Sequence, residues 1–347
     1  MRYNLFTDPH LGTRRQAHTT RESSQRLSNR LFSAAEAALH PKHPNLCLGD
    51  LFDRAHNEEA VLVQGHRIAE RCELVIAGNH DETNREGSVS TLRALGQMGS
   101  WIIAQHGLSE PRFHYHNDGI YVVPHHASQA QFEQALMQAG QHALNERAGK
   151  PAVLLLHCNY ASDFATQDAT LNLTEEMAAS LIGGAFDMIL LGHEHQPASY
   201  KSGGVVVLGN VHPTSFHDIS DKYRYTLHIT DDEVGLSKER IWSIADGYRE
   251  ISFGAGIPDL TGVQFVDVVG LGKAEDAVAL ADFINQIWRS GPDLCAVRNQ
   301  VQIGGMPQVL EEAARPALVD LKSTIGKELA GTDMLPLFKE IVAEVQR

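Results

Sequence analysis

Five short motifs carry side chains that can hold metal ions, and each follows an apolar stretch of the chain. In chain order they are Asp8-Pro9-His10, Gly49-Asp50-Leu51-Phe52-Asp53, Gly78-Asn79-His80-Asp81, His157 and Gly192-His193-Glu194-His195. The apolar stretches predict buried strands at residues 3–7, 45–48, 74–77, 152–156 and 188–191. Because open α/β sheets place their sites at the carboxyl ends of strands, we expect these side chains to gather at one edge.

The types of ligand indicate hard or borderline divalent ions. Carboxylates, imidazoles and an amide, with no cysteine in the motifs, suit manganese better than structural zinc. The ligands suffice for two ions, and Asp50 could bridge a pair about 3.5–4 Å apart, the separation used in two-metal hydrolysis. Such a centre is suited to splitting phosphate esters.

The third motif is the most specific of the five. Asn79 can offer its amide oxygen to an ion, which leaves His80 free to face the substrate. We expect Asp81 to hold the His80 imidazole and to favour its charged form. Asp53 of the second motif either orients a neighbouring side chain or is an acid that suits a helix N-terminus.

Charge gives a mixed signal about the substrate. The 347-residue chain has a net charge of −14, which argues against nucleic-acid binding. Residues 13–30, directly after the first motif, nevertheless contain five arginines and a single acid. This segment is either a backbone-binding edge for a polyanion or a solvated helix face. Arg14, Arg15 and His125, which follows a predicted strand at 121–124, are the candidate substrate-binding residues.

Cysteine usage and hydropathy indicate a cytoplasmic protein, whether of a cell or of a phage-infected host. The four cysteines are widely spaced and form no CxxC pair, so buried free thiols are expected. No apolar run has the length of a membrane span, and the N-terminus predicts a strand where a secretion signal would stand. We expect no membrane association.

The order of elements predicts an α/β (α+β) fold in three parts. Residues 1–235 alternate strands and helices, with helices expected at 26–39, 58–71, 129–147 and 173–181, and they predict a two-sheet β-sandwich flanked by helices. Residues 236–305 predict a small α/β unit. Residues 306–347 predict terminal helices, among them an amphipathic helix at 333–345 that packs on its own domain or docks on a partner.

Together the motifs resemble the calcineurin-type metallophosphoesterase superfamily. Its pattern of DxH, GDxxD, GNHD, H and GHxH is present in full, within roughly residues 1–235. Asp8-Pro9-His10-Leu11-Gly12 further resembles the DxHLG opening of the nuclease subunits of SbcCD-type double-strand-break repair complexes and their phage recombination counterparts.

The resemblance implies a role for each motif residue. One ion, most often manganese, would be held by Asp8, His10, Asp50 and His195, and a second by Asp50, Asn79, His157 and His193. His80 would assist departure of the sugar oxygen, and Asp81 and Asp53 would support the site.

The resemblance also implies a substrate and partners. Such nucleases cut DNA, from ends and within single strands, as homodimers working with an SMC-like coiled-coil ATPase in repair and recombination. Residues 236–305 would be a capping domain, and 306–347 would dock on the ATPase. Two alternatives stay open: a protein or small-molecule phosphatase using the same two ions, because the fold does not determine the substrate, and a non-catalytic scaffold.

Overall fold

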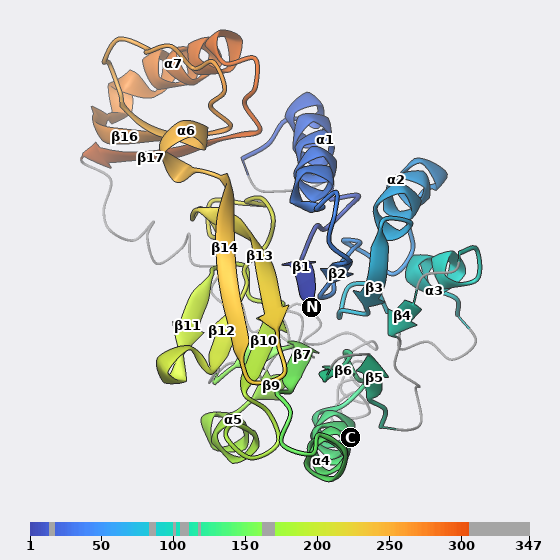
Figure 1. Cartoon of the computed structure of the whole chain (residues 1–347). Helices are drawn as coiled ribbons and strands as arrows, with labels where there is room; N and C mark the ends of the chain where they lie inside the picture. The colour runs from blue at the N-terminus through green and yellow to red at the C-terminus, as the bar shows by residue number, and fades with distance from the viewer. Residues whose placement is uncertain are drawn as a thin grey trace, which may run out of the picture.

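Two six-stranded β-sheets pack face to face at the centre of the molecule (Figure 1). The computed structural model describes residues 1–13, 18–82, 88–99, 102–104, 111–116, 119–161 and 171–304. The first sheet has the order β14-β13-β1-β2-β3-β4, and the second β11-β12-β10-β7-β6-β5. The predicted mixed α/β sandwich is therefore confirmed.

Parallel strands form the middle of each sheet, and three of the four sheet edges are antiparallel. The first sheet contains β1 (Arg2–Phe6), β2 (Asn45–Cys47), β3 (Cys72–Ile76), β4 (Ile102–Ala104), β13 (Lys222–Ile229) and β14 (Val234–Trp242). The second contains β5 (His114–His116), β6 (Ile120–Val123), β7 (Val153–His157), β10 (Met188–Gly192), β11 (Ala198–Tyr200) and β12 (Val205–Val207). In the centre, β1, β2 and β3 run parallel, as do β6, β7 and β10. The carboxyl ends of β1, β2, β3, β7 and β10 carry the five motifs.

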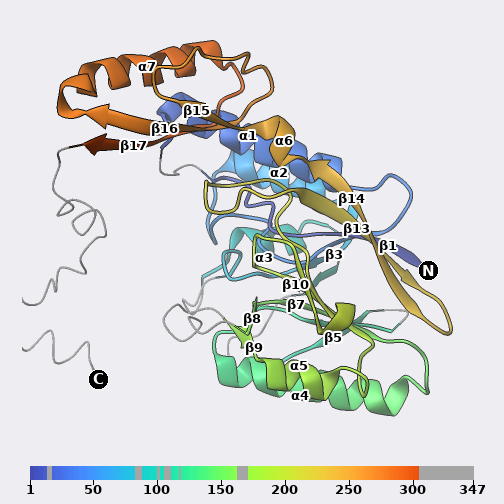
Figure 2. The same ribbon diagram turned by 90° about the vertical axis from the view of Figure 1, so that its left-hand side faces the viewer.

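Helices cover the outer face of each sheet, which gives four layers (Figure 2). The helices α1 (Arg21–Ala38), α2 (Glu59–Ala69) and α3 (Thr91–Gly96) pack on the first sheet, and α4 (Gln129–Glu146) and α5 (Glu175–Leu181) on the second. A central core lies between the sheets. In β7, for example, Leu155 faces that core and Leu156 faces the helices. Burial on both faces explains why the strands are continuous apolar runs.

Two helices begin at different residues from those predicted, because capping side chains determine where they start. The helix expected from residue 26 begins at Arg21, because the Thr20 side chain accepts from the Ser23 amide and closes a capping box. The helix expected from residue 173 begins at Glu175, because Thr174 caps it. Leu173 instead belongs to β9 (Asn172–Leu173), which pairs with β8 (Asn159–Tyr160).

A second, smaller unit follows β14. Its parallel sheet is formed by β15 (Tyr248–Ser252), β16 (Phe265–Lys273) and β17 (Ala296–Gly304), and α7 (Ala277–Ser290) packs on one face around Phe283 and Ile287. The chain enters this unit, called the cap below, through the short helix α6 (Ile244–Gly247). The boundary expected at residue 235 falls inside β14, so the first sheet extends to Trp242. Residues 306–347, including the expected helix at 333–345, lie outside the described residues.

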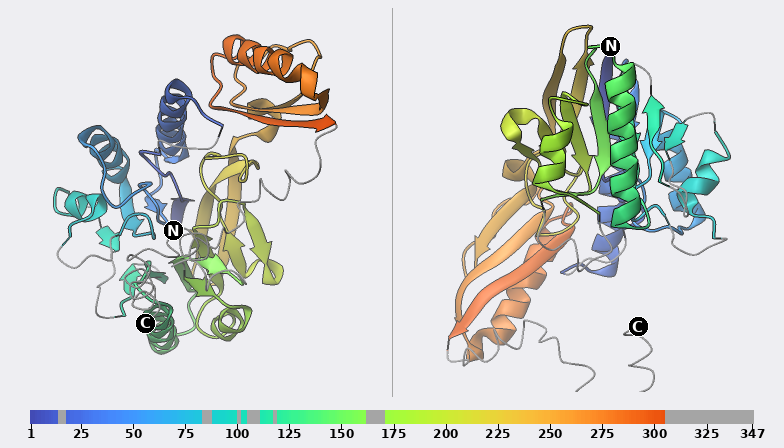
Figure 3. Two further views of the ribbon diagram at one scale, coloured as in Figure 1. Left: turned by 180° about the vertical axis from the view of Figure 1, so that it is seen from behind. Right: turned by 90° about the horizontal axis from the view of Figure 1, so that it is seen from below.

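The cap packs against α1 at one end of the sandwich (Figure 3). Leu27 and Leu31 of α1 share an apolar cluster with Phe265 of the cap. Arg26 donates to the carbonyl oxygen of Leu294 at 3.0 Å, and Arg30 pairs with the carboxylate of Asp293. Two arginines of the basic segment therefore hold the cap.

The cysteines are free thiols, as the sequence predicts. In the part of the chain that the structure describes, no helix is both long and apolar enough to cross a membrane. All four cysteines, Cys47, Cys72, Cys158 and Cys295, are buried free thiols. Burial raises the pKa of each, to about 12 for Cys72 and Cys295, which makes the thiols poor nucleophiles in the folded protein.

Packing of α4 should contribute strongly to stability. Phe132 of α4 is fully buried in the outer core of the second sheet, whereas Met137 on the same helix is 66% exposed. We expect Phe132→Ala to lower the free energy of unfolding by about 3–5 kcal/mol, because it leaves a cavity. Met137→Ala should change it by no more than about 0.5 kcal/mol. Chemical denaturation measures both, and equal effects would contradict this packing.

Candidate metal centre

The strand ends that carry the motifs approach one another too closely for side chains at three glycines. A Cβ atom at Gly49 would overlap the His157 ring, one at Gly78 would overlap the Asp50 carboxylate, and one at Gly192 would overlap the Thr7 hydroxyl. Gly49 also has a φ of +109°, which L side chains rarely adopt. The glycines of the motifs thus permit the close approach that brings the ligands together.

Four residues with candidate ligand side chains adopt left-handed backbone conformations. Asp8, His10, Asp50 and His193 have φ angles of 53°, 46°, 47° and 89°. Each such conformation costs of the order of 1–3 kcal/mol and persists only where the surroundings impose it, typically at functional sites. Here the backbone amide of His10 donates to the carbonyl of Asp50 at 3.0 Å, so the first two motifs hold each other.

One cluster of ligand atoms comes from the first and last motifs. Asp8, His10 and His195 each offer one ligand atom, and these atoms lie within 4.8 Å of one another, close enough to hold one metal ion. The Nε2 atoms of His10 and His195 are 2.9 Å apart, and Asp8 Oδ1 lies 3.7 Å from His10 Nε2. These residues come from the ends of β1 and β10.

A second cluster comes from the other three motifs and the end of β10. Asp50, His157 and His193 form it, and Asn79 joins them. The Asn79 Oδ1 atom lies 3.1 Å from His157 Nε2 and 3.0 Å from His193 Nδ1. The structure therefore brings all seven predicted ligands together.

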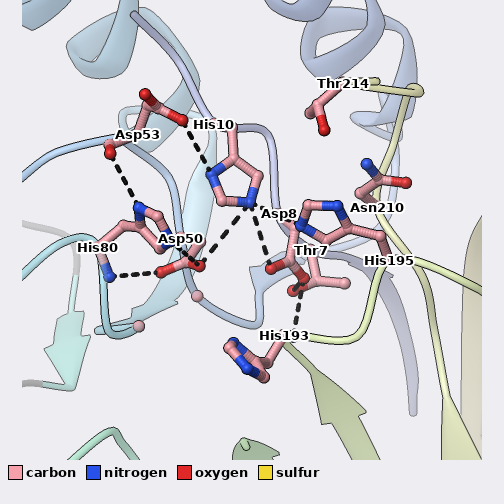
Figure 4. Close-up of polar contacts among 12 residues, drawn as sticks. Thr7, Asp8, His10, Asp50, Asp53, His80, His193, His195, Asn210 and Thr214 are labelled. Atoms are coloured by element: carbon pink, nitrogen blue, oxygen red, sulfur yellow. Dashed lines mark hydrogen bonds and ion pairs between the residues drawn. The ribbon is translucent and has the colours of Figure 1, made fainter. Parts of the chain in front are cut away.

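Asp50 lies between the two clusters, and Figure 4 shows its carboxylate beside the rings of His10 and His80. Its Oδ2 atom is 3.3 Å from Nε2 of His157 in one cluster and 3.8 Å from Nε2 of His10 in the other. Its Oδ1 atom accepts a hydrogen bond of 2.9 Å from the backbone amide of His80. One oxygen is thereby fixed by the third motif, while the other faces both clusters.

The donor set fits divalent ions. Asp8 Oδ1 and Asp50 Oδ2 are buried and have no hydrogen-bond partner among the described residues, an arrangement that is costly without a nearby cation. His157 Nδ1 can donate to the Leu48 carbonyl oxygen at 2.8 Å, and His195 Nδ1 to the Asp218 carboxylate at 3.1 Å. Each of these rings then presents the lone pair of Nε2 to the centre, as a metal ligand must.

The charges of the centre are strongly coupled. Burial opposes ionisation of Asp50, but the imidazoles of His157, His10 and His80 outweigh it and hold the pKa of Asp50 well below its usual range. Burial lowers the pKa of His157, yet the Asp50 and Asp8 carboxylates raise it to about 9. Burial and the neighbouring His157 lower the pKa of His193 to about 4. The carboxylates thus attract positive charge into the centre.

The hydrogen-bond partners of His80 and Asp81 differ from those expected from the sequence. His80 Nδ1 contacts the carbonyl oxygen of Asp53 at 2.9 Å, so the expected contact of its ring with Asp81 is not made. The Asp81 carboxylate instead accepts from the backbone amides of Phe52 and Gly78, at 2.9 and 3.1 Å. Asp81 therefore ties the second motif to the third.

Asp53 lies behind His10. Its Oδ1 atom accepts from the Thr13 hydroxyl at 2.8 Å and is 3.6 Å from His10 Nδ1. The side chain is thus placed to orient His10, which agrees with one of the two interpretations of Asp53 from the sequence.

Two supporting residues were missed in the sequence. Asp218, 23 residues after His195, accepts from its ring and also from the Asn210 amide and the Thr214 backbone amide, at 2.8 and 2.9 Å. The fully buried Lys222 donates to the carbonyl oxygens of His195 and Asp218. Burial lowers the pKa of Lys222 to about 8. Neither residue follows an apolar strand in a motif, so the pattern that predicts the seven ligands does not point to Asp218 or Lys222.

The predicted substrate-binding residues are only partly described. Arg14 and Arg15 lie outside the described residues. His125 is buried just after β6, and its backbone amide donates to the carbonyl oxygen of Ala77 at 3.0 Å. Glu194, given no role from the sequence, accepts from the backbone amide of Tyr160 at 2.6 Å and so fixes β8 beside the last motif.

Comparison with known proteins identifies the family. The sequence pattern of the family described as Calcineurin-like phosphoesterase matches residues 1–197, which include all five motifs, and the chain belongs to this family. Members hydrolyse phosphoester bonds with a dimetal centre. No curated protein matches the chain closely enough to be called a relative.

Asp218 should matter for metal affinity. Asp218→Asn removes the negative charge that orients His195, and such changes typically cost about 10–100-fold in affinity. We expect one of the two manganese-binding events seen by calorimetry to weaken by that factor. Asp221→Asn is the matched control, since Asp221 pairs with Arg240 at 3.1 Å and contacts none of the ligands. Equal affinities in the two variants would contradict the role of Asp218.

Proposed function

We propose that this protein is a DNA nuclease that hydrolyses phosphodiester bonds at the dimetal centre, with manganese as the preferred ion. The observation that carries the proposal is the position of Asp50 Oδ2, which is buried between two clusters of imidazoles and has no hydrogen-bond partner among the described residues. A carboxylate that faces two clusters is the feature expected of a bridging ligand.

The residues divide into two groups that would hold the ions. Asp8, His10, Asp50 and His195 would hold one ion, and Asp50, Asn79, His157 and His193 the other. When bound, the ions would supply Lewis-acid charge for the phosphoryl group and lower the pKa of water. The hydrogen bonds from His157 to Leu48 and from His195 to Asp218 keep the ligands oriented.

His80 is placed to act as the proton donor. Its side chain is 41% exposed and its Nε2 lies 4.0 Å from Asp50 Oδ2, so the ring borders the centre and is open to substrate. Burial lowers the pKa of His80, but the Asp50 carboxylate and the Asp53 carbonyl oxygen raise it above its ordinary value. The protonated ring can give its proton to the leaving sugar oxygen, a general-acid role.

Several features support DNA as the substrate. The DxHLG opening resembles the repair nucleases, and the basic segment begins three residues after His10. The cap packs on α1, the helix that follows the first motif, and would offer a second surface to a long polyanion. Arg26 and Arg30 contact the cap, which leaves Arg14, Arg15 and Arg21 as the arginines of this segment for phosphate contacts.

The partners follow from the same resemblance. We propose a homodimer that works with an SMC-like coiled-coil ATPase in DNA repair or recombination, with residues 306–347 as the docking element. The alternative is a protein or small-molecule phosphatase with the same centre, which the acidic net charge of −14 favours.

Two variants separate metal binding from proton transfer. Asp50→Ala should abolish manganese binding and activity, because it removes the carboxylate shared by both clusters. His80→Ala should keep manganese binding but lower kcat by about 10²–10⁴-fold, the usual contribution of a general acid. Calorimetry and single-turnover cleavage provide the two measurements.

The control for His80→Ala is His66→Ala, because His66 lies on α2, outside the five motifs, and pairs with Glu70 at the end of that helix. An unchanged cleavage rate in His80→Ala would overturn the assignment of the proton donor.

Substrate class is decided by parallel assays with manganese. We expect end-labelled double-stranded and single-stranded DNA to be degraded, and a chelator to stop the reaction. Phosphopeptides and nucleotides should release little phosphate. The opposite preference would establish the phosphatase alternative, and an absence of both bound metal and turnover would indicate a scaffold.

A further inference from the structure

Phe216 connects the cap to the loop beside the metal centre. Its ring meets Phe265 of β16 edge-on, with centroids 5.6 Å apart. The guanidinium carbon of Arg298 on β17 lies 4.5 Å from the Phe216 centroid, and the His18 ring packs edge-on at 5.8 Å. Phe216 belongs to the sandwich unit, yet two of these three partners belong to the cap.

The cap side of this contact is rigidly built. Arg298 forms two hydrogen bonds of 2.7 Å with the Asp267 carboxylate, a bidentate arrangement that fixes the guanidinium plane. Tyr248 donates to the same carboxylate at 2.9 Å. Asp267 is almost completely buried, so little solvent weakens these bonds. The cation over the Phe216 ring is therefore held in place by two strands of the cap.

The other side of Phe216 leads to a metal ligand. The residues just before it, Thr214 and Ser215, donate their backbone amides to the Asp218 carboxylate at 2.9 and 2.8 Å. Asp218 in turn accepts from the ring of His195. Phe216 thus lies inside the turn whose amides hold this carboxylate.

A second contact ties the start of the same loop to the cap. His212 Nε2 lies 2.5 Å from Gln264 Oε1, which also accepts from the indole N–H of Trp242 at 3.1 Å. The loop between His212 and Asp218 is thereby attached to the cap at two points. His212 contacts Gln264, and Phe216 contacts Phe265 and Arg298. A shift of the cap must move this loop or break both contacts.

We propose that Phe216 is a positioning residue that couples the cap to the metal centre: its ring, seated against Phe265 and Arg298, fixes the turn that aims Asp218 at His195. The proposal rests on the proposed dimetal function of His195. With the ring removed, the turn loses its anchor, His195 loses part of its orientation, and the ion on that side binds more weakly. Because the contact at Gln264 remains, we expect a loss of about tenfold, the low end for supporting residues.

The test compares three folded variants of the full chain. Phe216→Ala removes the anchor, and Phe216→Tyr keeps the ring and should restore wild-type behaviour. Phe283→Ala is the matched control. Phe283 belongs to the cap core, so its replacement by alanine destabilises the cap without removing a contact to the loop. Circular dichroism verifies folding, and Phe216→Leu replaces Phe216→Ala if that variant does not fold.

Two measurements report on the coupling. Manganese calorimetry should show one of two binding events weakened about tenfold in Phe216→Ala and unchanged in Phe216→Tyr and Phe283→Ala. In the metal-free protein, the NMR signal of the His195 Nδ1 proton should be lost or shifted in Phe216→Ala alone. This second signal depends on the hydrogen bond to Asp218 and requires neither metal nor substrate.

The outcomes separate this inference from the proposed function. If the wild-type chain binds no manganese, the dimetal function fails and the inference fails with it. If the wild type binds two ions and Phe216→Ala binds them equally well, only the coupling is overturned. An equal loss in Phe283→Ala would also overturn it, because general loosening of the cap would then explain the effect.

Discussion

The buried carboxylate of Asp50 is the constraint on which the rest of the molecule depends. A negative charge removed from water is costly unless positive charge is close. Three imidazoles supply that charge to Asp50, and they reach it from three other motifs. Strand ends from both sheets must therefore converge on one point, and the motif glycines are the residues whose absence of a side chain allows it.

Orientation of the ligands is built in before any ion arrives. His157 and His195 each use one ring nitrogen to contact an acceptor outside the centre, Leu48 in one case and Asp218 in the other. The backbone amide of His80 fixes one oxygen of Asp50. Because these bonds form within the protein, ion binding requires little reordering of side chains, which favours affinity.

Strand-end chemistry could be predicted from the sequence because each motif is local. A ligand and the strand before it lie within a few residues, so residue type and apolar pattern suffice to place Asp8 or His193 at the sheet edge. Asp218 could not be found in this way, because its contact with His195 depends on a loop packed against another unit. The partner of the His80 ring was mistaken for the same reason: the Asp53 carbonyl oxygen comes from a different motif.

Sheet edges were also hard to predict. The strand β14 exposes Ser237, Lys238, Glu239 and Arg240, so its apolar pattern is weak, and pairing with β13 is what makes it a strand. Charged residues on an edge strand discourage pairing with other chains. The domain boundary expected at residue 235 lies inside this strand, because the polar residues that form the edge of the sheet read as a loop in the sequence.

The reactivity of the four buried thiols can report how often each region of the molecule opens locally. Cys72 lies in the outer core of the first sheet, Cys158 in that of the second, and Cys295 where the cap meets α1. None can react with an alkylating reagent while its surroundings stay closed, so the labelling rate at each position follows the opening of that region. Without any added probe, a single mass-spectrometric time course would rank the two halves of the sandwich and the cap contact by how often each exposes its interior.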